Sequence, residues 1–448
     1  MQENRGRFSS RLGFILAAAG SAVGLGNIWG FPTQAASNGG AAFLLVYLVL
    51  AFCLAYPVLM AELVIGRHTR GNPIHALRTI ASGGASRGLG TLVGGVGIVC
   101  AGLILSFYSI VGGWMLAHFL AAITGLVGLS TATDFLVGFT TPRNILFAVL
   151  FMFLTIRIVA SGIESGIERW STRLMPALIA MLVLLTLYVL TLPGAMDGLR
   201  EYLVPNFEEA LTPKLIISAL GSAFFSLSLG VGTMLIYGSY VSEKESLPSL
   251  GAQVTLIDIS IAVMAGFLIL PAMYVALHNG VEIFAANGAL ISEDTLIFTV
   301  LPALFDSMGT AGAIVGLAFF LLMSIAALTS SISMLEVPVA AVVEQTSIKR
   351  TKAAYLTGSI IFAVSVVIIF NFADLFGAVI ALTTRYTQPL LGMMFCLYVG
   401  WIWQRNGVLE ELKKGAPDVA NGIFWKIWPV YVKFFCPVIV LMIFVQAL

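Results

Sequence analysis

Two short stretches of a very apolar chain carry glycine and small polar residues where long aliphatic side chains would be expected. Residues 20–27 read GSAVGLGN and residues 226–233 read SLSLGVGT, so each contains a Gly-x-Gly. Glycine destabilises a helix because it loses more backbone entropy than other residues. A broken helix would free carbonyl oxygens for a hard cation such as sodium and N–H groups for a carboxylate. Two facing breaks could therefore hold both charges of a zwitterion.

A third stretch, IAALTSSIS at residues 325–333, gathers hydroxyl groups within an apolar segment. Neutral hydroxyls and carbonyls can surround sodium without burying a net negative charge. A structural interpretation also exists for each motif. Glycines four residues apart, such as Gly20 and Gly24, let helices pack closely, and a Ser or Thr hydroxyl can bond back to the preceding helical turn. The three stretches in combination favour a binding site.

The composition places these motifs inside a membrane. Of the 448 residues, 59% are hydrophobic and 10% are charged, whereas roughly a quarter of a soluble domain is charged. The net charge of +1 gives no reason to expect a nucleic-acid partner. The four cysteines form no CxxC pair, so neither a disulfide framework nor a zinc site is indicated. The sequence predicts an all-α polytopic protein that resides in a lipid bilayer.

A helix needs ~20 apolar residues to cross the hydrocarbon, and the sequence predicts eleven such helices. They are expected at residues 11–36, 41–66, 88–123, 143–160, 166–191, 213–240, 249–278, 311–343, 350–371, 374–404 and 421–446. We expect one transport domain over residues 1–448, with five-helix sets at 11–191 and 213–404 and an additional helix at 421–446. Because five is odd, the two sets would be inverted relative to each other, with broken first helices meeting at the bilayer midplane.

Basic residues are concentrated in alternate loops. The N-terminus and the loops around 67–87, 157–173, 349–352 and 405–426 hold most of the Lys and Arg, whereas residues 279–310 hold none. Cytoplasmic loops carry the excess of basic residues, so the N-terminus is expected to be cytoplasmic and the C-terminus extracellular. The acidic, partly apolar loop at 279–310 is expected to contain a re-entrant or surface-lying helical pair.

Five stretches together resemble the neurotransmitter:sodium symporter family. They read RLGFILAAAGSAVGLGNIWGFP, NGGAAFLLVYLVLAFCLAYPVLMAELVIGR, SGIERWSTRLMP, FFSLSLGVGTMLIYGSY and ALTSSIS. The chain looks closest to bacterial, eleven-helix members that carry several hydrophobic amino acids. The resemblance implies a leucine-transporter-like fold in the bacterial inner membrane. It also implies sodium-coupled symport of bulky aliphatic and aromatic L-amino acids by alternating access.

The resemblance implies two sodium ions beside one substrate site. The first sodium site would comprise Ala22, Asn27, Ser226 and Asp258, completed by the substrate carboxylate. The second would comprise Gly20, Val23, Ala326, Thr329 and Ser330. Many relatives have an amide at the position of Asp258, and an acid there would add a fixed negative charge that makes chloride unnecessary. The alternative is an aspartate that is bonded to a neighbouring hydroxyl.

The implied substrate site lies between the two predicted breaks. Tyr108 would bind the substrate carboxylate and help to close the outer side, and Phe225 would form an aromatic lid. The substrate-binding residues would be Ala22, Gly24, Leu25, Gly26, Ile104, Tyr108, Phe225, Ser226, Ser228, Val231, Ser330, Ser331 and Met334. Val231 stands where a leucine-carrying relative has a larger aromatic residue, which leaves apolar room for bulky side chains. Tyr108 could instead anchor the membrane interface.

The resemblance also implies gating residues. These are Arg5, Phe8, Gly166, Pro176, Tyr240, Glu344 and Asp374. Arg5 and Phe8 would seal the inner side against Ser239, Tyr240 and Glu344. Unwinding between Gly166 and Pro176 would open a water path to the second sodium site, although a helix start at a polar loop is the alternative. Asp374 would be the acid of the outer gate, but Gly30 occupies the usual place of its arginine partner.

Two charges within predicted spans need partners, because a charge in the bilayer interior is costly. Glu62 and Arg385 are expected to pair with each other or to share a water network with Gln388; alternatively, each reaches interfacial water separately. The other classes of membrane protein fit less well. No GxxxxGK[ST] motif suggests a pump, no histidine spacing suggests an intramembrane enzyme, and a channel would not require an inverted repeat. The oligomeric state is left open.

Overall fold

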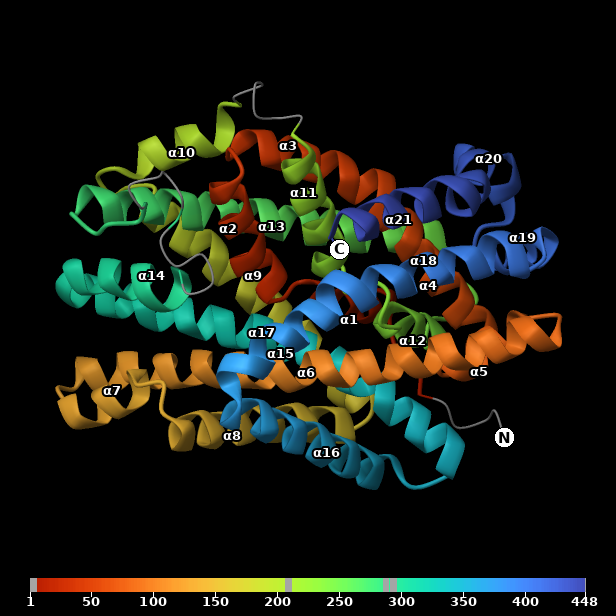
Figure 1. Ribbon diagram of the computed structural model, residues 1–448, viewed down its shortest axis with the longest axis horizontal. Coiled ribbons are helices and arrows are strands. Elements are labelled where there is room, and N and C mark those ends of the chain that lie inside the picture. Colours follow the sequence, from red (N-terminus) through yellow and green to blue (C-terminus); the bar gives the residue numbers. More distant parts are fainter. Residues whose placement is uncertain (1–5, 206–211, 285–289, 291–295, 448) are drawn as a thin grey trace.

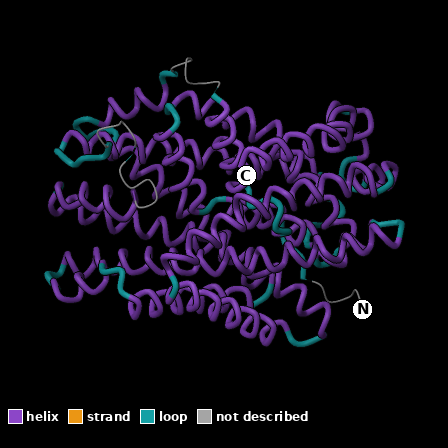
Figure 2. The backbone as a smooth tube through the Cα atoms, viewed as in Figure 1, coloured by secondary structure: helices purple, strands orange, loops and turns teal. Residues whose placement is uncertain are grey.

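The computed structural model describes residues 6–205, 212–284, 290 and 296–447. Nearly all of these residues are helical and most connections are short (Figure 2). The expected all-α class is therefore confirmed.

The helices fall into two sets in chain order. The first set comprises α1 (Arg11–Ala22), η1 (Gly26–Gly30), α2 (Phe31–Ser37), α3 (Ala41–Leu50), η2 (Ala51–Ala55), α4 (Tyr56–Thr69), α5 (Pro73–Ile80), α6 (Gly84–Leu126), α7 (Ser130–Val137), α8 (Thr141–Ala160), η3 (Ile163–Glu168), α9 (Arg169–Val189) and α10 (Ala195–Leu203). The second comprises α11 (Pro213–Ser226), α12 (Thr233–Ser239), α13 (Leu247–His278), α14 (Leu296–Ser307), α15 (Gly309–Thr346), α16 (Arg350–Phe370), α17 (Phe372–Ile380), η5 (Ala381–Thr387), α18 (Gln388–Leu397), η6 (Tyr398–Ile402), α19 (Arg405–Lys413), η7 (Pro417–Asn421), α20 (Ile423–Val430), η8 (Tyr431–Phe435) and α21 (Cys436–Ala447).

Within the described ranges, eight helical stretches are long and apolar enough to cross a bilayer, and α1 with η1–α2 forms a ninth that is bent by 55°. Residues 213–239 and 372–402 are built from shorter consecutive helices. Each of the eleven expected spans is therefore mostly helical, while the count of eleven crossings stays a prediction. In the loop expected at 279–310, helix α14 is present, and residues 285–289 and 291–295 lie outside the described part.

The long helices share one direction. Figure 1 shows α6, α13 and α15 running along the long axis, and α6 packs closely against α15. Helices α7, α10 and α14 lie toward one end of the molecule, whereas α5 and α19 lie toward the other (Figure 1). We call the second end, formed by α5, α19 and the loop at residues 240–246, the basic end.

Two helices are interrupted near the centre of the molecule. Helix α1 ends at Ala22, Val23 adopts extended angles (φ −71°, ψ 101°), and helical structure resumes at Gly26. Between α11 and α12, residues 227–232 are not helical, and Gly230 and Gly232 have φ of 86° and 81°. Residues with a Cβ rarely adopt such angles, so glycine is needed at this break. Both expected discontinuities are present, although Gly20 itself lies within α1.

Candidate functional site

The break after α1 is bonded to the middle of α6. The backbone N–H of Leu25 donates a hydrogen bond to the hydroxyl of Tyr108, with 2.7 Å between the nitrogen and the oxygen. Gly24 lies so close that an added Cβ would be 2.3 Å from the Tyr108 oxygen and 2.5 Å from Oγ of Ser330. Tyr108 is only 2% exposed, which places its polar group in the interior. Only glycine at position 24 lets these groups approach the broken backbone.

A pocket lies between the two helix breaks. Its lining residues are Ala22, Gly24, Gly26, Ile104, Tyr108, Phe225, Ser228, Val231, Ser330, Met334 and Gln388. All of them except Gln388 belong to the predicted substrate site. The structure therefore brings together residues of α1, α6, α11, α15 and the α11–α12 break that lie far apart in the sequence.

Three residues of the predicted substrate site are not in the pocket lining. Leu25 contributes its backbone N–H to Tyr108, and the side chain of Ser226 turns toward Asp258. The hydroxyl of Ser331 donates to the carbonyl of Leu328 and lies 2.9 Å from the hydroxyl of Thr155 on α8. Successive helical residues point about 100° apart because a turn takes 3.6 residues, so Ser331 faces α8 while Ser330 faces the pocket.

The residues of the predicted first sodium site meet at a buried carboxylate. Nδ2 of Asn27 lies 2.7 Å from Oδ1 of Asp258 and 2.8 Å from Oγ of Ser226. The Ser226 hydroxyl donates to Oδ2 of Asp258 over 2.6 Å. All three residues are buried, and Ala22 is nearby in the pocket lining. Rotation of the Asn27 amide would turn its oxygen toward these groups, so the set can offer several oxygens to a cation.

The charge of Asp258 lacks a basic partner: among the described residues, no Lys or Arg forms an ion pair with it. An isolated carboxylate in the bilayer interior is costly. A sodium ion at this position would balance the charge. The donor set therefore fits a transported cation, and its hydrogen bonds to Ser226 and Asn27 show that the alternative of a bonded aspartate applies at the same time.

The residues of the predicted second sodium site also come together. Oγ of Ser330 donates to the carbonyls of Gly20, at 3.3 Å, and Val23, at 3.2 Å. Oγ1 of Thr329 donates to the carbonyl of Ala326 at 3.1 Å. These five oxygens come from α1, its break and α15. Rotation of the two hydroxyls would direct their lone pairs toward a cation instead of donating to the carbonyls.

The carboxylate of Glu62 caps the break between α11 and α12. Its Oε1 accepts from the N–H of Gly230 at 2.6 Å, and its Oε2 accepts from the N–H of Leu235 at 3.3 Å. Arg385 is exposed on η5. The expected pairing of Glu62 with Arg385 is therefore wrong. The broken helix exposes N–H groups that need acceptors, and a negative charge at the N-terminus of α12 is favourable.

At the basic end, the N-terminal segment packs against the loop that follows α12. The N–H of Phe8 donates to the carbonyl of Tyr240 at 3.3 Å, and the two rings are 6.2 Å apart. The Tyr240 hydroxyl donates to Oε1 of Glu336 at 2.6 Å, and Glu336 also pairs with Arg350. Phe8 and Tyr240 thus meet, while their role as an inner seal stays a prediction, and Glu336 and Arg350 were not foreseen.

Of the three remaining residues assigned to the two gates, Glu344 and Asp374 lie in the described part of the chain. Oε2 of Glu344 accepts from the backbone and side-chain nitrogens of Asn72, at 2.8 and 2.7 Å, and so holds the α4–α5 connection. Arg5 lies outside the described residues. Asp374 is exposed in the first turn of α17, and none of the ion pairs in the described part involves it. The outer gate therefore stays a prediction.

The start of the fifth predicted span has an irregular helix and a cleft. Gly166 lies in the π-helix η3, where an added Cβ would be 2.1 Å from the carbonyl oxygen of Ile158. Pro176 lies inside α9. A cleft beside η3 is lined by Gly6, Arg7, Ser9, Ser10, Ile163, Glu164, Ser165, Glu168, Arg169 and Thr172. Glu168 bridges it by accepting from the N–H and hydroxyl of Ser9, at 2.7 and 2.8 Å.

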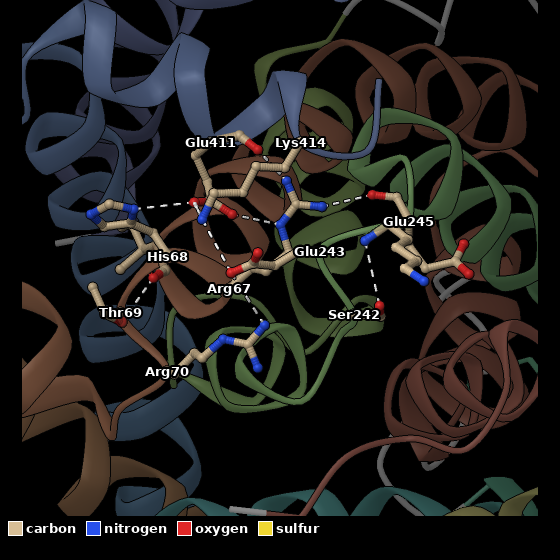
Figure 3. A network of polar contacts seen from close by, with 11 residues as sticks. Arg67, His68, Thr69, Arg70, Ser242, Glu243, Glu245, Glu411 and Lys414 are labelled. Carbon is tan, nitrogen blue, oxygen red and sulfur yellow. Dashed lines mark hydrogen bonds and ion pairs between the residues drawn. The ribbon is translucent and has the colours of Figure 1, made fainter. Parts of the chain in front are cut away.

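A polar network at the basic end joins distant segments (Figure 3). Arg67, fully buried at the end of α4, donates from Nε to Oε1 of Glu411 at 2.7 Å. It also donates to the backbone carbonyls of Glu411 and Glu245. The network thereby fixes α19 and the loop between α12 and α13 to the end of α4.

Other charges complete this network. Lys414 lies 3.0 Å from Oε2 of Glu411 and 3.2 Å from Glu243, and Arg70 pairs with Glu243 at 3.6 Å (Figure 3). Burial by itself raises the pKa of Glu411, but hydrogen bonds from His68 and Lys414 together with the charge of Arg67 outweigh burial and lower that pKa to about 2. Sequence reasoning missed the network, for which the only local signals were basic residues after α4 and adjacent acids in α19.

Comparisons with known proteins agree with this architecture. The family model described as sodium:neurotransmitter symporter family matches residues 5–137 and 137–448. An uncharacterized sodium-dependent transporter of Bacillus subtilis, YhdH, is 35% identical over 98% of this chain and 97% of that protein. An uncharacterized sodium-dependent transporter of Haemophilus influenzae is 33% identical over 100% and 99% of the two chains. The crystal structure of MhsT in complex with L-phenylalanine matches with a TM-score of 0.85 and 35% identity, over 99% of this chain and 100% of that one.

Proposed function

Because the chain belongs to the sodium:neurotransmitter symporter family, we propose that it imports hydrophobic L-amino acids by sodium-coupled symport. The pocket between the two helix breaks is the observation that carries this proposal. Its polar side includes the Tyr108 hydroxyl, which accepts from the Leu25 N–H and whose own O–H can donate to a carboxylate. Its apolar side includes Ile104, Val231 and Met334, which suits bulky aliphatic and aromatic side chains. MhsT, which has the same fold, was crystallised with L-phenylalanine.

Two sodium ions would accompany the substrate. The first would bind Ala22, Asn27, Ser226 and Asp258 and contact the substrate carboxylate directly. The second would bind Gly20, Val23, Ala326, Thr329 and Ser330 and so tie the α1 break to α15. The fixed negative charge of Asp258 makes chloride unnecessary in this proposal.

Coupling requires that the ligands favour different conformations of the protein. Sodium would order the breaks in α1–α2 and α11–α12 and complete the amino-acid site. Substrate would allow closure over Tyr108 and Phe225, of which Phe225 is half-buried. Separation of Phe8 from Tyr240 and unwinding of η3 near Gly166 would then open the inner side. Asp374 would act at the outer gate, and Arg5, Pro176 and Glu344 would act at the inner one.

We place the single transport domain, residues 1–448, in the bacterial inner membrane. The basic end, which holds Arg67, Arg70 and Lys414, would face the cytoplasm in accordance with the distribution of positive charge. The N-terminus would then be cytoplasmic and the C-terminus extracellular.

Uptake of radiolabelled phenylalanine, leucine and glycine by proteoliposomes tests the proposal. An inward sodium gradient should drive accumulation of phenylalanine and leucine above equilibrium, and replacement of sodium by choline should abolish it. Replacement of chloride by gluconate should leave uptake unchanged. Equal uptake with sodium and with choline, or preference for glycine over the two larger amino acids, would overturn the proposal.

A further inference from the structure

Gln388 is the pocket residue that the proposed function leaves without a role. It is the first residue of α18, it lines the pocket, and it is only 2% exposed. Its side-chain oxygen Oε1 has no hydrogen-bond partner among the described residues. A buried amide oxygen without a partner is destabilising, so its position at a ligand pocket points to a partner that arrives with the ligand.

The surroundings of Gln388 place it at the α11–α12 break. An added Cβ on Gly230 would lie 2.1 Å from the backbone carbonyl oxygen of Gln388, so the two backbones touch. Val231, the next residue, lines the apolar part of the pocket. The Tyr108 hydroxyl, which is proposed to bind the carboxylate, is bonded to the Leu25 N–H at the other break. An amino acid whose carboxylate is held at the α1 break would direct its side chain toward the α11–α12 break. Gln388 therefore lies on the side of the pocket that would contact the substrate side chain.

Other polar side chains of the pocket are already bonded within the protein. The hydroxyl of Ser228 donates to the carbonyl of Ser21 at 3.0 Å. The hydroxyl of Ser330 donates to the carbonyls of Gly20 and Val23. These hydroxyls are each held by a bond within the protein, whereas the oxygen of Gln388 has no partner among the described residues and can accept from a donor on the ligand.

We propose that Gln388 recognises an aromatic substrate by accepting a hydrogen bond from a donor on the ring of the substrate side chain. The indole N–H of tryptophan and the phenol O–H of tyrosine carry such a donor. Phenylalanine and leucine suit the same apolar walls but leave the Gln388 oxygen unpaired. The inference rests on the proposed amino-acid transport and assigns aromatic amino acids with a ring N–H or O–H as the preferred substrates.

The test compares tryptophan with 3-benzothienylalanine, in which sulfur replaces the indole N–H at nearly the same shape. Equilibrium binding of both ligands and of phenylalanine is measured on the purified full-length protein in saturating sodium and in choline. The wild type should bind tryptophan about threefold to tenfold more tightly than the analogue, as one neutral hydrogen bond provides. Gln388→Met, which keeps the length of the side chain, should make the two affinities equal. Gln404→Met, at an exposed position, should keep the wild-type ratio.

Equal affinities for the two ligands in the wild type would overturn the inference, and this arm needs no variant. A wild-type ratio that persists in Gln388→Met, or in Gln388→Leu if the first variant does not fold, would also overturn it. If phenylalanine, tryptophan and the analogue all fail to bind in a sodium-dependent manner, the proposed function itself is overturned. Failure of the inference is thus distinguishable from failure of the function, because phenylalanine binding reports the function alone.

Discussion

Nδ2 of Asn27 lies 2.7 Å from Oδ1 of Asp258, which joins the break after α1 to the middle of α13. Ser226, the last residue of α11, bonds to the same carboxylate. The ends of both interrupted helices therefore converge on one buried acid. A sodium ion at this point would tie the two breaks together and balance the charge, and the proposed coupling depends on this.

Asp258→Asn should weaken sodium binding, because the substitution removes the fixed charge that balances the cation while it preserves the shape of the side chain. We expect the sodium concentration for half-maximal amino-acid binding to rise by about tenfold, which is equivalent to ~1.4 kcal/mol. Sodium titrations with labelled phenylalanine measure this. Asp134→Asn, at an exposed position on α7, should behave like the wild type, and an unchanged sodium requirement in Asp258→Asn would rule out a role for this carboxylate.

Gly24→Ala should abolish amino-acid binding. The new methyl group would lie 2.3 Å from the Tyr108 oxygen and 2.5 Å from Oγ of Ser330, so the side chains that line the pocket would have to move. Gly30→Ala is the matched control, because among the described residues a Cβ there would have one neighbour within 4 Å, the Leu25 carbonyl at 3.8 Å. Amino-acid binding is measured on both purified variants, and Gly30→Ala should bind like the wild type. Retained binding in Gly24→Ala would contradict the close packing of this break.

Tyr108→Phe should lower amino-acid affinity by about tenfold or more. It removes the hydroxyl that is proposed to donate to the substrate carboxylate, and a hydrogen bond to a charged group contributes ~1.5–3 kcal/mol. Tyr355→Phe, at an exposed site on α16, serves as the control. If Tyr108→Phe binds phenylalanine as tightly as the wild type does, the Tyr108 hydroxyl does not contribute to the site.

Glu411→Gln should destabilise the protein without changing the residues of the pocket. Removing one charge from a fully buried ion pair with Arg67 typically costs ~3–5 kcal/mol, and thermal unfolding in detergent at neutral pH measures the loss. Glu410→Gln is the control, because the Glu410 side chain is 72% exposed. A melting temperature equal to that of the wild type would show that the network in Figure 3 adds no stability.

The Arg67–Glu411 ion pair also predicts that the stability of the protein depends on pH. The pKa of Glu411 is lowered in the folded protein from 4.5 to about 2, so its stabilising contribution is complete above pH ~4.5 and is lost as the pH falls toward about 2. The difference in melting temperature between the wild type and Glu411→Gln should therefore shrink over this interval. A difference that stays constant from pH 5 down to about pH 2 would contradict the lowered pKa.

The breaks could be predicted because their chemistry is local in the sequence, whereas most of the pocket residues were predicted from the resemblance to a known family. Gly230 and Gly232 adopt positive φ, and glycine is the residue type that such backbone conformations select. The position of Ser331 could not be read from the TSS motif alone, because neighbouring helical residues face different directions and the register of α15 against α8 decides which hydroxyl meets the pocket.

Long-range charge partners were beyond sequence reasoning. Arg67 and Glu411 are 344 positions apart, and nothing in either local pattern selects the other residue. Glu62 was assigned the wrong kind of partner, because opposite charges on neighbouring helices suggested a salt bridge. Glu62 instead accepts from backbone N–H groups at the α11–α12 break, which need hydrogen-bond acceptors. The need for an acceptor there becomes evident only once the helix is known to be interrupted.

The dependence of phenylalanine binding on sodium tests most directly whether the two helix breaks form one joint site. Equilibrium binding to the purified protein should be measured over a range of sodium concentrations, with choline maintaining the ionic strength. The joint site predicts that the phenylalanine dissociation constant falls by at least about tenfold as sodium rises to saturation, and that phenylalanine tightens sodium binding by the same factor. A dissociation constant that is the same in sodium and in choline would contradict the account.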